Sequence, residues 1–374
     1  RAANPELRAA RREADAAAAE VRRASAWPDP QVEAAREDTP DMGRTLYTVK
    51  QDIPFPGKTW LERSAAAARA RAARARADAA EQDIVSRVTL AFHALARSDG
   101  TIEALDAAQA LMAQSADVAK AHLAGNAGPA DEYLLMQAEA VNMAAMLAQE
   151  RNDRAIAEAM LAELLRRPRD RARFGRTQAP PLVAPSRDAD ALLAAARARA
   201  PDLAAARSEA DEARLMATRA VLEFAPDLMP FYQQQRYDGG DTGRMFGLGL
   251  TVPLWIWKPA GALAAARARR DAAAARRDAA DAALGRRIAV ESLEVASHRR
   301  RAEDAREVVI PLLEQAVRIA RANYEGGRGD VLRLLTAVRG LLSAQRDYHE
   351  EVYRYAEHWA ELWRATGGTL EGTP

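Results

Sequence analysis

The sequence predicts a mostly helical fold that carries two short β-hairpins. Three observations lead to this prediction: long stretches rich in Ala and Arg with few helix breakers, short stretches in which large apolar and small residues alternate, and a pattern that occurs twice along the 374 residues. Ala and Arg favour helices, whereas alternation with a period of two is typical of strands. Each hairpin comes directly before a very long helix, which is an unusual order of elements.

The stretch Met245–Lys258 contains the clearest strand candidate. Large apolar residues alternate there with small ones, so one face of a strand would hold Phe246, Leu248, Leu250 and Val252. Such a face requires a protein core or lipid against it. Trp255 and Trp257 follow, and tryptophans in this position suit a membrane interface.

The first half of the chain is predicted to hold a helix, a hairpin, a long helix and a return helix. The first helix opens at Pro5, which suits a first turn. The hairpin is expected over residues 31–53, with Tyr47 and Val49 on its apolar face. The long helix over 59–124 would measure about 100 Å at 1.5 Å per residue. A Gly- and Pro-rich reversal precedes the return helix over 131–167, and an irregular connector ends this half.

The second half repeats this order. Pro201–Asp211 resembles Pro5–Asp15 at an offset of 196 residues. The elements expected after the opening helix are a hairpin over 227–254, a long helix over 258–323 and a return helix over 330–366. We therefore predict two repeats, residues 1–187 and 188–374.

Composition excludes several classes of function. The net charge is only +1 and charged residues make up 29% of the chain, with Arg interspersed among Asp and Glu, so nothing favours nucleic acid as a partner. The absence of cysteine excludes disulfides and thiolate metal sites. No apolar run reaches the 18 residues of a membrane-spanning helix, so a membrane role would require a β-barrel.

Four strands cannot close a barrel alone, and open strand edges are not tolerated in lipid. Strands from several chains would have to join, and three chains would supply twelve strands around a lumen. The alternative is a soluble coiled-coil scaffold protein built from the Ala-rich helices. That alternative gives no role to the alternation at Phe246 to Val252.

Several stretches, in this order and in both halves, resemble the TolC-like outer-membrane efflux proteins. They are Gln51–Lys58, Val252–Trp255, Asp131–Glu139, Tyr324–Gly327 and Asp330–Leu335. Within the first, Pro54–Lys58 resembles the cation-efflux (CusC/CzcC-like) branch of outer-membrane factors. The resemblance covers nearly the whole chain.

The resemblance implies a homotrimer in the outer membrane of a Gram-negative bacterium. Its fold would be mostly α with a membrane β-barrel: twelve strands in outer-membrane lipid, continued by a long periplasmic α-helical barrel. The trimer would be the exit duct of a tripartite efflux system, together with a periplasmic adaptor (membrane fusion protein) and an inner-membrane transporter of the resistance-nodulation-division type. The duct would conduct its cargo passively, and heavy-metal cations are one candidate cargo.

The resemblance also implies roles for single residues. The helix reversals would form the periplasmic tip and gate, at Gly125, Asp131, Tyr324, Gly327, Arg328, Asp330 and Arg333. Charged side chains from three chains around one axis would make a constriction of the kind that controls pores. Arg333 stands where the family often has Asp, so either Asp330 or Arg333 faces the pore. The lipid-facing residues would be Tyr47, Val49, Phe246, Leu248, Leu250 and Val252.

No residue pattern indicates catalysis, a metal site or a cofactor. The five histidines are scattered, and His349 and His358 lack the i, i+4 spacing of paired ligands on one helix face. Met136, Met143 and Met146 recur at helical spacing, which favours a packing stripe over a soft-metal site. No nucleophile with a base and an orienting group is present, so we do not expect an enzyme.

Overall fold

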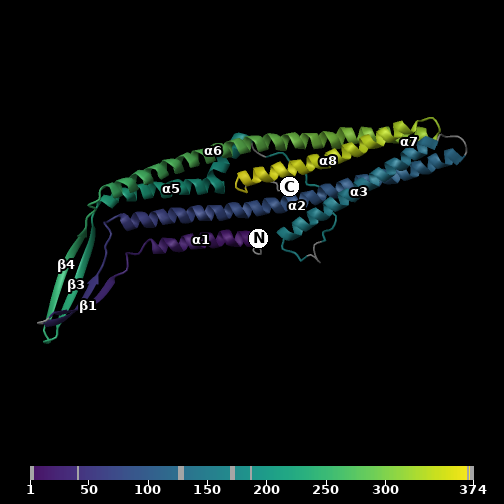
Figure 1. The fold of residues 1–374 in the computed structure, drawn as a ribbon. Coiled ribbons are helices and arrows are strands. Elements are labelled where there is room, and N and C mark those ends of the chain that lie inside the picture. Colours follow the sequence, from purple (N-terminus) through teal and green to yellow (C-terminus); the bar gives the residue numbers. More distant parts are fainter. Residues whose placement is uncertain are drawn as a thin grey trace. The chain divides into compact units, whose positions relative to one another are not determined.

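The computed structural model describes residues 4–39, 42–124, 130–168, 173–185, 188–368 and 370. They form long helices and one four-stranded antiparallel sheet (Figure 1). The chain divides into two compact units. The helical unit comprises residues 1–5, 81–200 and 284–374, and the sheet unit comprises residues 6–80 and 201–283. Each unit takes segments from both halves of the sequence, and the division into two repeats stays a prediction.

The sheet unit contains both hairpins. Its elements are α1 (Pro5–Arg23), β1 (Gln31–Thr39), β2 (Met42–Lys50), α5 (Pro201–Val221), a short 3₁₀ turn (Leu222–Phe224), β3 (Asp227–Tyr237) and β4 (Thr242–Thr251), with the first parts of α2 (Lys58–Ala124) and α6 (Trp257–Asp304). The strand order is β1-β2-β3-β4, so the two hairpins join through β2 and β3. There Val49 pairs with Tyr232, and Tyr47 with Gln234.

The helical unit contains the later parts of α2 and α6 together with α3 (Ala130–Leu164), α4 (Ala189–Arg199), α7 (Ile310–Glu325) and α8 (Val331–Ala365). One helix was expected over 258–323, but a π-helical turn at Ala305–Val309 separates α6 from α7. Pro311 follows this turn, and its missing N–H cannot continue the regular hydrogen-bond ladder. The helix before β3 is also interrupted, because Ala200 adopts an extended conformation before Pro201.

The main core of the helical unit lies among α2, α3, α7 and α8. Met112, Met136 and Leu334 are fully buried in it, and Tyr324 and Leu335 pack nearby. Met143 is also buried, and Met146 packs against the same cluster. The interpretation of the methionines as a packing stripe is therefore confirmed. No helix in the described part of the chain combines the length and apolar character that a membrane-spanning segment requires.

Candidate functional site

The two helix reversals of the helical unit lie next to each other (Figure 1). Tyr324, near the end of α7, is 2% exposed, and its hydroxyl lies 3.4 Å from a carboxylate oxygen of Glu132 at the start of α3. Its ring centroid is 6.0 Å from that of His122 near the end of α2. Burial, together with the Glu132 carboxylate, raises the pKa of Tyr324 to about 12. Tyr324 therefore anchors one reversal to the other, whereas Gly125 lies outside the described residues.

The second reversal is built by its backbone. Gly327 has a φ of +67°, a left-handed conformation that glycine adopts without strain. The Arg328 N–H donates to the carbonyl of Asn323 at 2.9 Å, which closes the turn after α7. Asp330 then caps α8, because its carboxylate accepts a hydrogen bond of 3.0 Å from the N–H of Leu332.

Asp330 caps a helix, and the other charged residues of the predicted tip are exposed. The Asp330 carboxylate serves the first turn of α8, whereas Arg328 and Arg333 are exposed. On the other reversal Asp131 is also exposed, in the first turn of α3. The Asp131 carboxylate likewise accepts a hydrogen bond, of 3.1 Å, from the Glu132 N–H.

An ion pair between a buried glutamate and an exposed arginine connects α3 to α8 behind the reversals. Glu139 is 5% exposed and receives two hydrogen bonds from the Arg339 guanidinium, one of them at 2.9 Å. The hydrogen bond from Arg339 holds the pKa of Glu139 below its usual range, against the opposing effect of burial. Sequence reasoning missed this pair because its members lie 200 residues apart.

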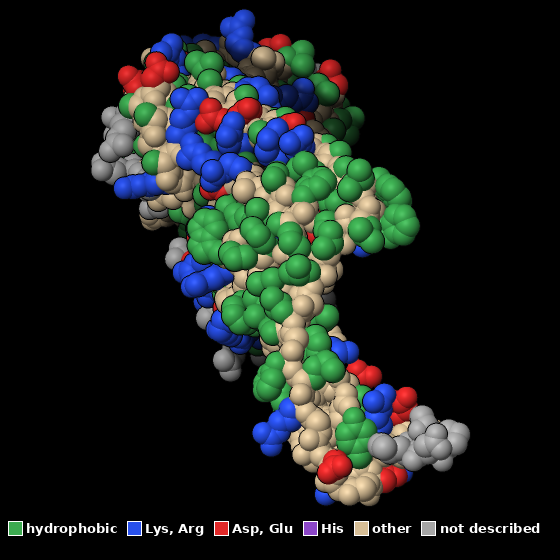
Figure 2. Space-filling model, turned by 90° about the vertical axis from the view of Figure 1, so that its left-hand side faces the viewer, with side chains coloured by type: hydrophobic (Ala, Val, Ile, Leu, Met, Phe, Trp, Pro, Cys, Tyr) green, Lys and Arg blue, Asp and Glu red, His purple; other side chains and the backbone are tan. Residues whose placement is uncertain are grey.

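The predicted apolar face of the sheet is exposed in the single chain. Phe246 is 78% exposed, and Leu248, Leu250 and Val252 keep more than half of their surface exposed. Strand register places Val49 and Phe246 on the same face, because both pair with Tyr232. Figure 2 shows hydrophobic side chains gathered where the strands meet the helices of the sheet unit. The chain itself does not cover this face.

Side-chain packing on the opposite face of the sheet explains why glycines alternate along β4. A Cβ on Gly247 would collide with the ring of Phe231, and one on Gly249 would come within 2.9 Å of the Met229 methyl group. The glycines therefore leave room for the large side chains of β3, which lie across them. Here the small residues permit packing within the sheet.

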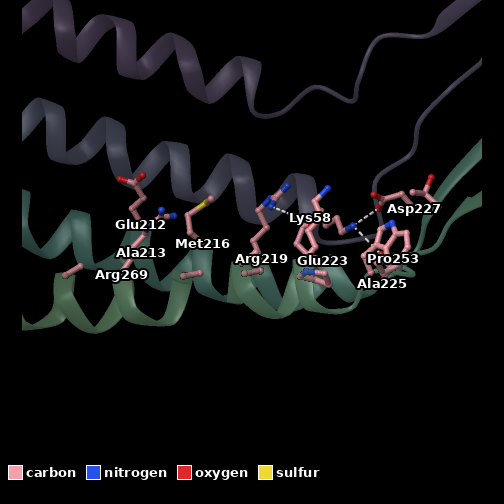
Figure 3. A pocket seen from close by; sticks show the side chains of 18 of the residues that line it. Lys58, Glu212, Ala213, Met216, Arg219, Glu223, Ala225, Asp227, Pro253 and Arg269 are labelled. Carbon is pink, nitrogen blue, oxygen red and sulfur yellow. Dashed lines mark hydrogen bonds and ion pairs between the residues drawn. The ribbon is translucent and has the colours of Figure 1, made fainter. Parts of the chain in front are cut away.

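The Pro54–Lys58 stretch forms the connection from β2 to α2, and it docks onto Asp227 at the start of β3. One Asp227 carboxylate oxygen accepts from the Phe55 N–H at 2.6 Å and from the Lys58 ammonium at 2.8 Å (Figure 3). The ammonium also donates to the Ala225 carbonyl at 3.3 Å. The Lys58 side chain is only 6% exposed, so Asp227 is its essential counterion. This junction fixes the exit of one hairpin to the entry of the other.

A groove of about 810 Å³ runs from this junction between α5 and α6 (Figure 3). Met216 and Ala220 contribute to its apolar lining. Two of its four arginines are paired within the chain, since Arg219 contacts Glu223 and Arg69 contacts Glu212. We assign no ligand to this groove.

The fold brings together two histidines that the sequence leaves apart. His298 on α6 and His358 on α8 stack with ring centroids 5.1 Å apart. A carboxylate oxygen of Glu294 lies 3.6 Å from His298 Nε2. The only sequence signal was the i, i+4 spacing of Glu294 and His298, which is common on exposed helix faces.

Comparison with known proteins agrees with this geometry. Residues 192–368 match the family model of the outer membrane efflux proteins. The chain is also 26% identical over 349 residues to the cobalt-zinc-cadmium resistance protein CzcC of Cupriavidus metallidurans, an alignment that covers 92% of this chain and 82% of that protein. The second half of the chain thus matches the outer membrane efflux proteins, and nearly the whole chain is similar to CzcC.

Solved structures share the fold. The outer membrane protein VceC of Vibrio cholerae superposes with a TM-score of 0.85 at 22% identity, covering 99% of this chain and 94% of VceC. CusC gives 0.82 at 16% identity, with 98% and 89% covered. The CmeC outer membrane channel of Campylobacter jejuni gives 0.81 at 16% identity, with 99% and 84% covered.

The efflux protein therefore has the TolC-like fold that its sequence predicts. The matches support an outer-membrane location and the function of an exit duct for efflux. Its family and its structural neighbours are channels rather than enzymes. The alternative of a soluble scaffold protein finds no support.

Proposed function

We propose that three copies of the efflux protein form one duct, in which their sheets close a twelve-stranded β-barrel and their helices a periplasmic α-barrel. The observation that carries this proposal is the exposed apolar face at Phe246, Leu248 and Leu250 on a four-stranded sheet. In the described chain β1 and β4 are edge strands, each with one partner. Lipid requires every strand edge to be paired, and pairing β1 of one copy with β4 of the next satisfies both edges.

The match to the outer membrane efflux proteins supports a tripartite assembly. The partners proposed here are a periplasmic adaptor (membrane fusion protein) and an inner-membrane transporter of the resistance-nodulation-division type. The relative CzcC is a cobalt-zinc-cadmium resistance protein, which supports heavy-metal cations as the cargo. The duct conducts this cargo passively, since the pump supplies the energy.

The proposed gate lies at the helix reversals. Asp131, Arg328 and Arg333 are exposed there, and a threefold axis would bring three copies of each together. The capping role of Asp330 favours the arginines as the charges that face the pore, because the Asp330 carboxylate is already engaged. A ring of arginines raises the electrostatic barrier to cations, so the adaptor would have to widen the ring before a cation leaves.

The trimer is tested by native mass spectrometry of the full chain released from detergent micelles. We expect a trimer, and we expect Leu250→Asp to abolish it, because the substitution places a charge on the lipid face. Gln233→Asp is the matched control, since it adds the same charge to the opposite face of the sheet. A monomer that stays soluble without detergent would overturn the trimeric duct.

The gate is tested by single-channel recording in planar bilayers. Arg328→Ala should raise the conductance, because it removes three positive charges and three long side chains from the constriction. The Arg333→Ala variant tests whether Arg333 also restricts the conductance. Arg300→Ala, on the exposed surface of α6, is the control. Unchanged conductance in both reversal variants would argue against a gate at this position.

A further inference from the structure

Two histidines from different helices meet in the helical unit, away from the helix reversals. α6 and α8 run side by side there (Figure 1), and each contributes one ring. The rings of His298 and His358 are nearly parallel, with an interplanar angle of 10° and centroids 5.1 Å apart. Both residues are partly buried.

Each ring has a carboxylate at its Nδ1 atom. His298 Nδ1 lies 2.6 Å from an oxygen of Glu351, and His358 Nδ1 lies 2.8 Å from an oxygen of Glu291. A carboxylate only accepts hydrogen bonds, so the proton of each neutral ring is held on Nδ1 and the lone pair is left on Nε2. Metal-binding histidines in proteins typically have this arrangement, in which the outer carboxylate fixes the tautomer and the ring orientation.

Glu294 provides a third possible metal ligand. Glu294 lies one helical turn before His298 on α6, and its carboxylate oxygen is 3.6 Å from His298 Nε2. One possible ligand atom from each of Glu294, His298 and His358 lies within 4.8 Å of the other two. Zinc bonds of about 2.0–2.1 Å would place such atoms roughly 3.3 Å apart, so small side-chain rotations close the set around one ion.

The local charge favours a cation. The two rings contact three carboxylates, those of Glu291, Glu294 and Glu351. Arg301 pairs with one of them, Glu351, at 3.2 Å. With both rings neutral, this group of side chains carries an excess of negative charge, which a divalent ion would offset.

From this geometry we propose that the efflux protein binds one divalent transition-metal ion of the zinc and cobalt class through Glu294, His298 and His358. Two imidazole nitrogens and one carboxylate, with a fourth position open to water, suit zinc or cobalt; calcium and magnesium require oxygen ligands. The bound ion would tie α6 to α8. The site stands on side-chain geometry alone and does not depend on which cargo the duct conducts.

The test uses the full chain in detergent after removal of metal with a chelator. Calorimetric titration with Zn²⁺ should give one ion per chain, and Co²⁺ should produce the visible absorption of a four-coordinate site. His298→Ala and His358→Ala should each abolish this absorption. Glu351→Gln should weaken Zn²⁺ binding about 10- to 100-fold, because it removes an outer partner while all three ligands remain. His122→Gln, which changes a histidine near the reversals, should bind as the original chain does.

Two results of the Zn²⁺ titration would overturn the proposed metal site. Absence of a stoichiometric Zn²⁺ isotherm would leave only the contacts between the two histidines and their carboxylates. Retention of full affinity in the double variant His298→Ala/His358→Ala would place the ion elsewhere. If these variants fold poorly by circular dichroism, Glu294→Gln on the partly exposed surface of α6 provides the same test without changing the ring stack.

The experiment also separates this site from the duct. Native mass spectrometry of the same samples reports whether the chain is a trimer. A trimer that binds no Zn²⁺ contradicts only the metal site, whereas a Zn²⁺-binding chain that is not a trimer contradicts only the proposed assembly. A Zn²⁺-dependent rise in the melting temperature that His298→Ala removes would show that the ion stabilises the folded helices.

Discussion

Leu334 and Leu250 have the same side chain, but one is buried and the other is exposed. Leu334 is fully buried among α2, α3, α7 and α8, whereas Leu250 on β4 is 58% exposed. Near the reversals, helices from both halves cover each other's apolar residues. The four strands of the sheet have nothing within the chain to cover their apolar face. The helical unit therefore has a core of its own, whereas in the proposed assembly the sheet depends on lipid and on other copies of the chain.

The largest expected effect tests this comparison directly. Leu334→Ala should lower the free energy of unfolding by about 3–5 kcal/mol, since it leaves a cavity in a closely packed core. Leu250→Ala should change the stability of the single chain by only about 0.5 kcal/mol, as exposed substitutions usually do. Chemical denaturation of both variants in a mild detergent measures the difference. Equal losses would mean that the sheet face is packed against protein in the single chain.

The Lys58–Asp227 junction of the sheet unit provides the second test, because the Lys58 charge is deeply buried there next to the strands. Asp227→Asn removes the counterion of Lys58 and should cost about 2–4 kcal/mol. Asp238→Asn is the matched control. Its partner Arg36 is about half exposed, so the loss should stay within about 1 kcal/mol. If Lys58→Met/Asp227→Asn regains part of the stability, the cost lies in the unpaired charge.

The smallest effect concerns a polar group inside the helical unit. His93 is 3% exposed, and neither ring nitrogen has a hydrogen-bond partner among the described residues. Burial lowers the pKa of His93 to about 4, whereas the ring titrates near 6.5 in the unfolded chain. Between these values the unfolded chain binds the additional proton. The stability that depends on neutral His93 is therefore present above pH 6.5 and is lost as the pH falls toward 4.

His93→Leu should remove this dependence. Across the window the stability difference between the original chain and the variant should change by roughly 1–3 kcal/mol. Acidic groups with lowered pKa values, such as Glu139, also lose stabilisation at low pH, but they do so in both proteins. Parallel pH profiles of the two chains would show that His93 is hydrated in the folded state.

Local patterns predicted the elements closely where Gly and Pro mark their ends. β3 begins at residue 227, where the second hairpin was expected to begin, and α2 begins one residue before the expected 59. The difference at Ala305–Val309 arises because a π-helical turn keeps the helical pattern of apolar residues almost unchanged. Periodicity therefore could not reveal it, and Pro311 was the only local indication.

The sequence by itself determined where the helices, strands and reversals lie and which strand face is apolar, because backbone propensity and side-chain period act over a few neighbouring residues. Tertiary structure decided which charged and polar groups meet. Lys58 reaches Asp227, Glu139 reaches Arg339, and His298 stacks on His358. The members of each pair are separated by 60 residues or more, so their contact depends on how distant segments pack, and no local pattern records that.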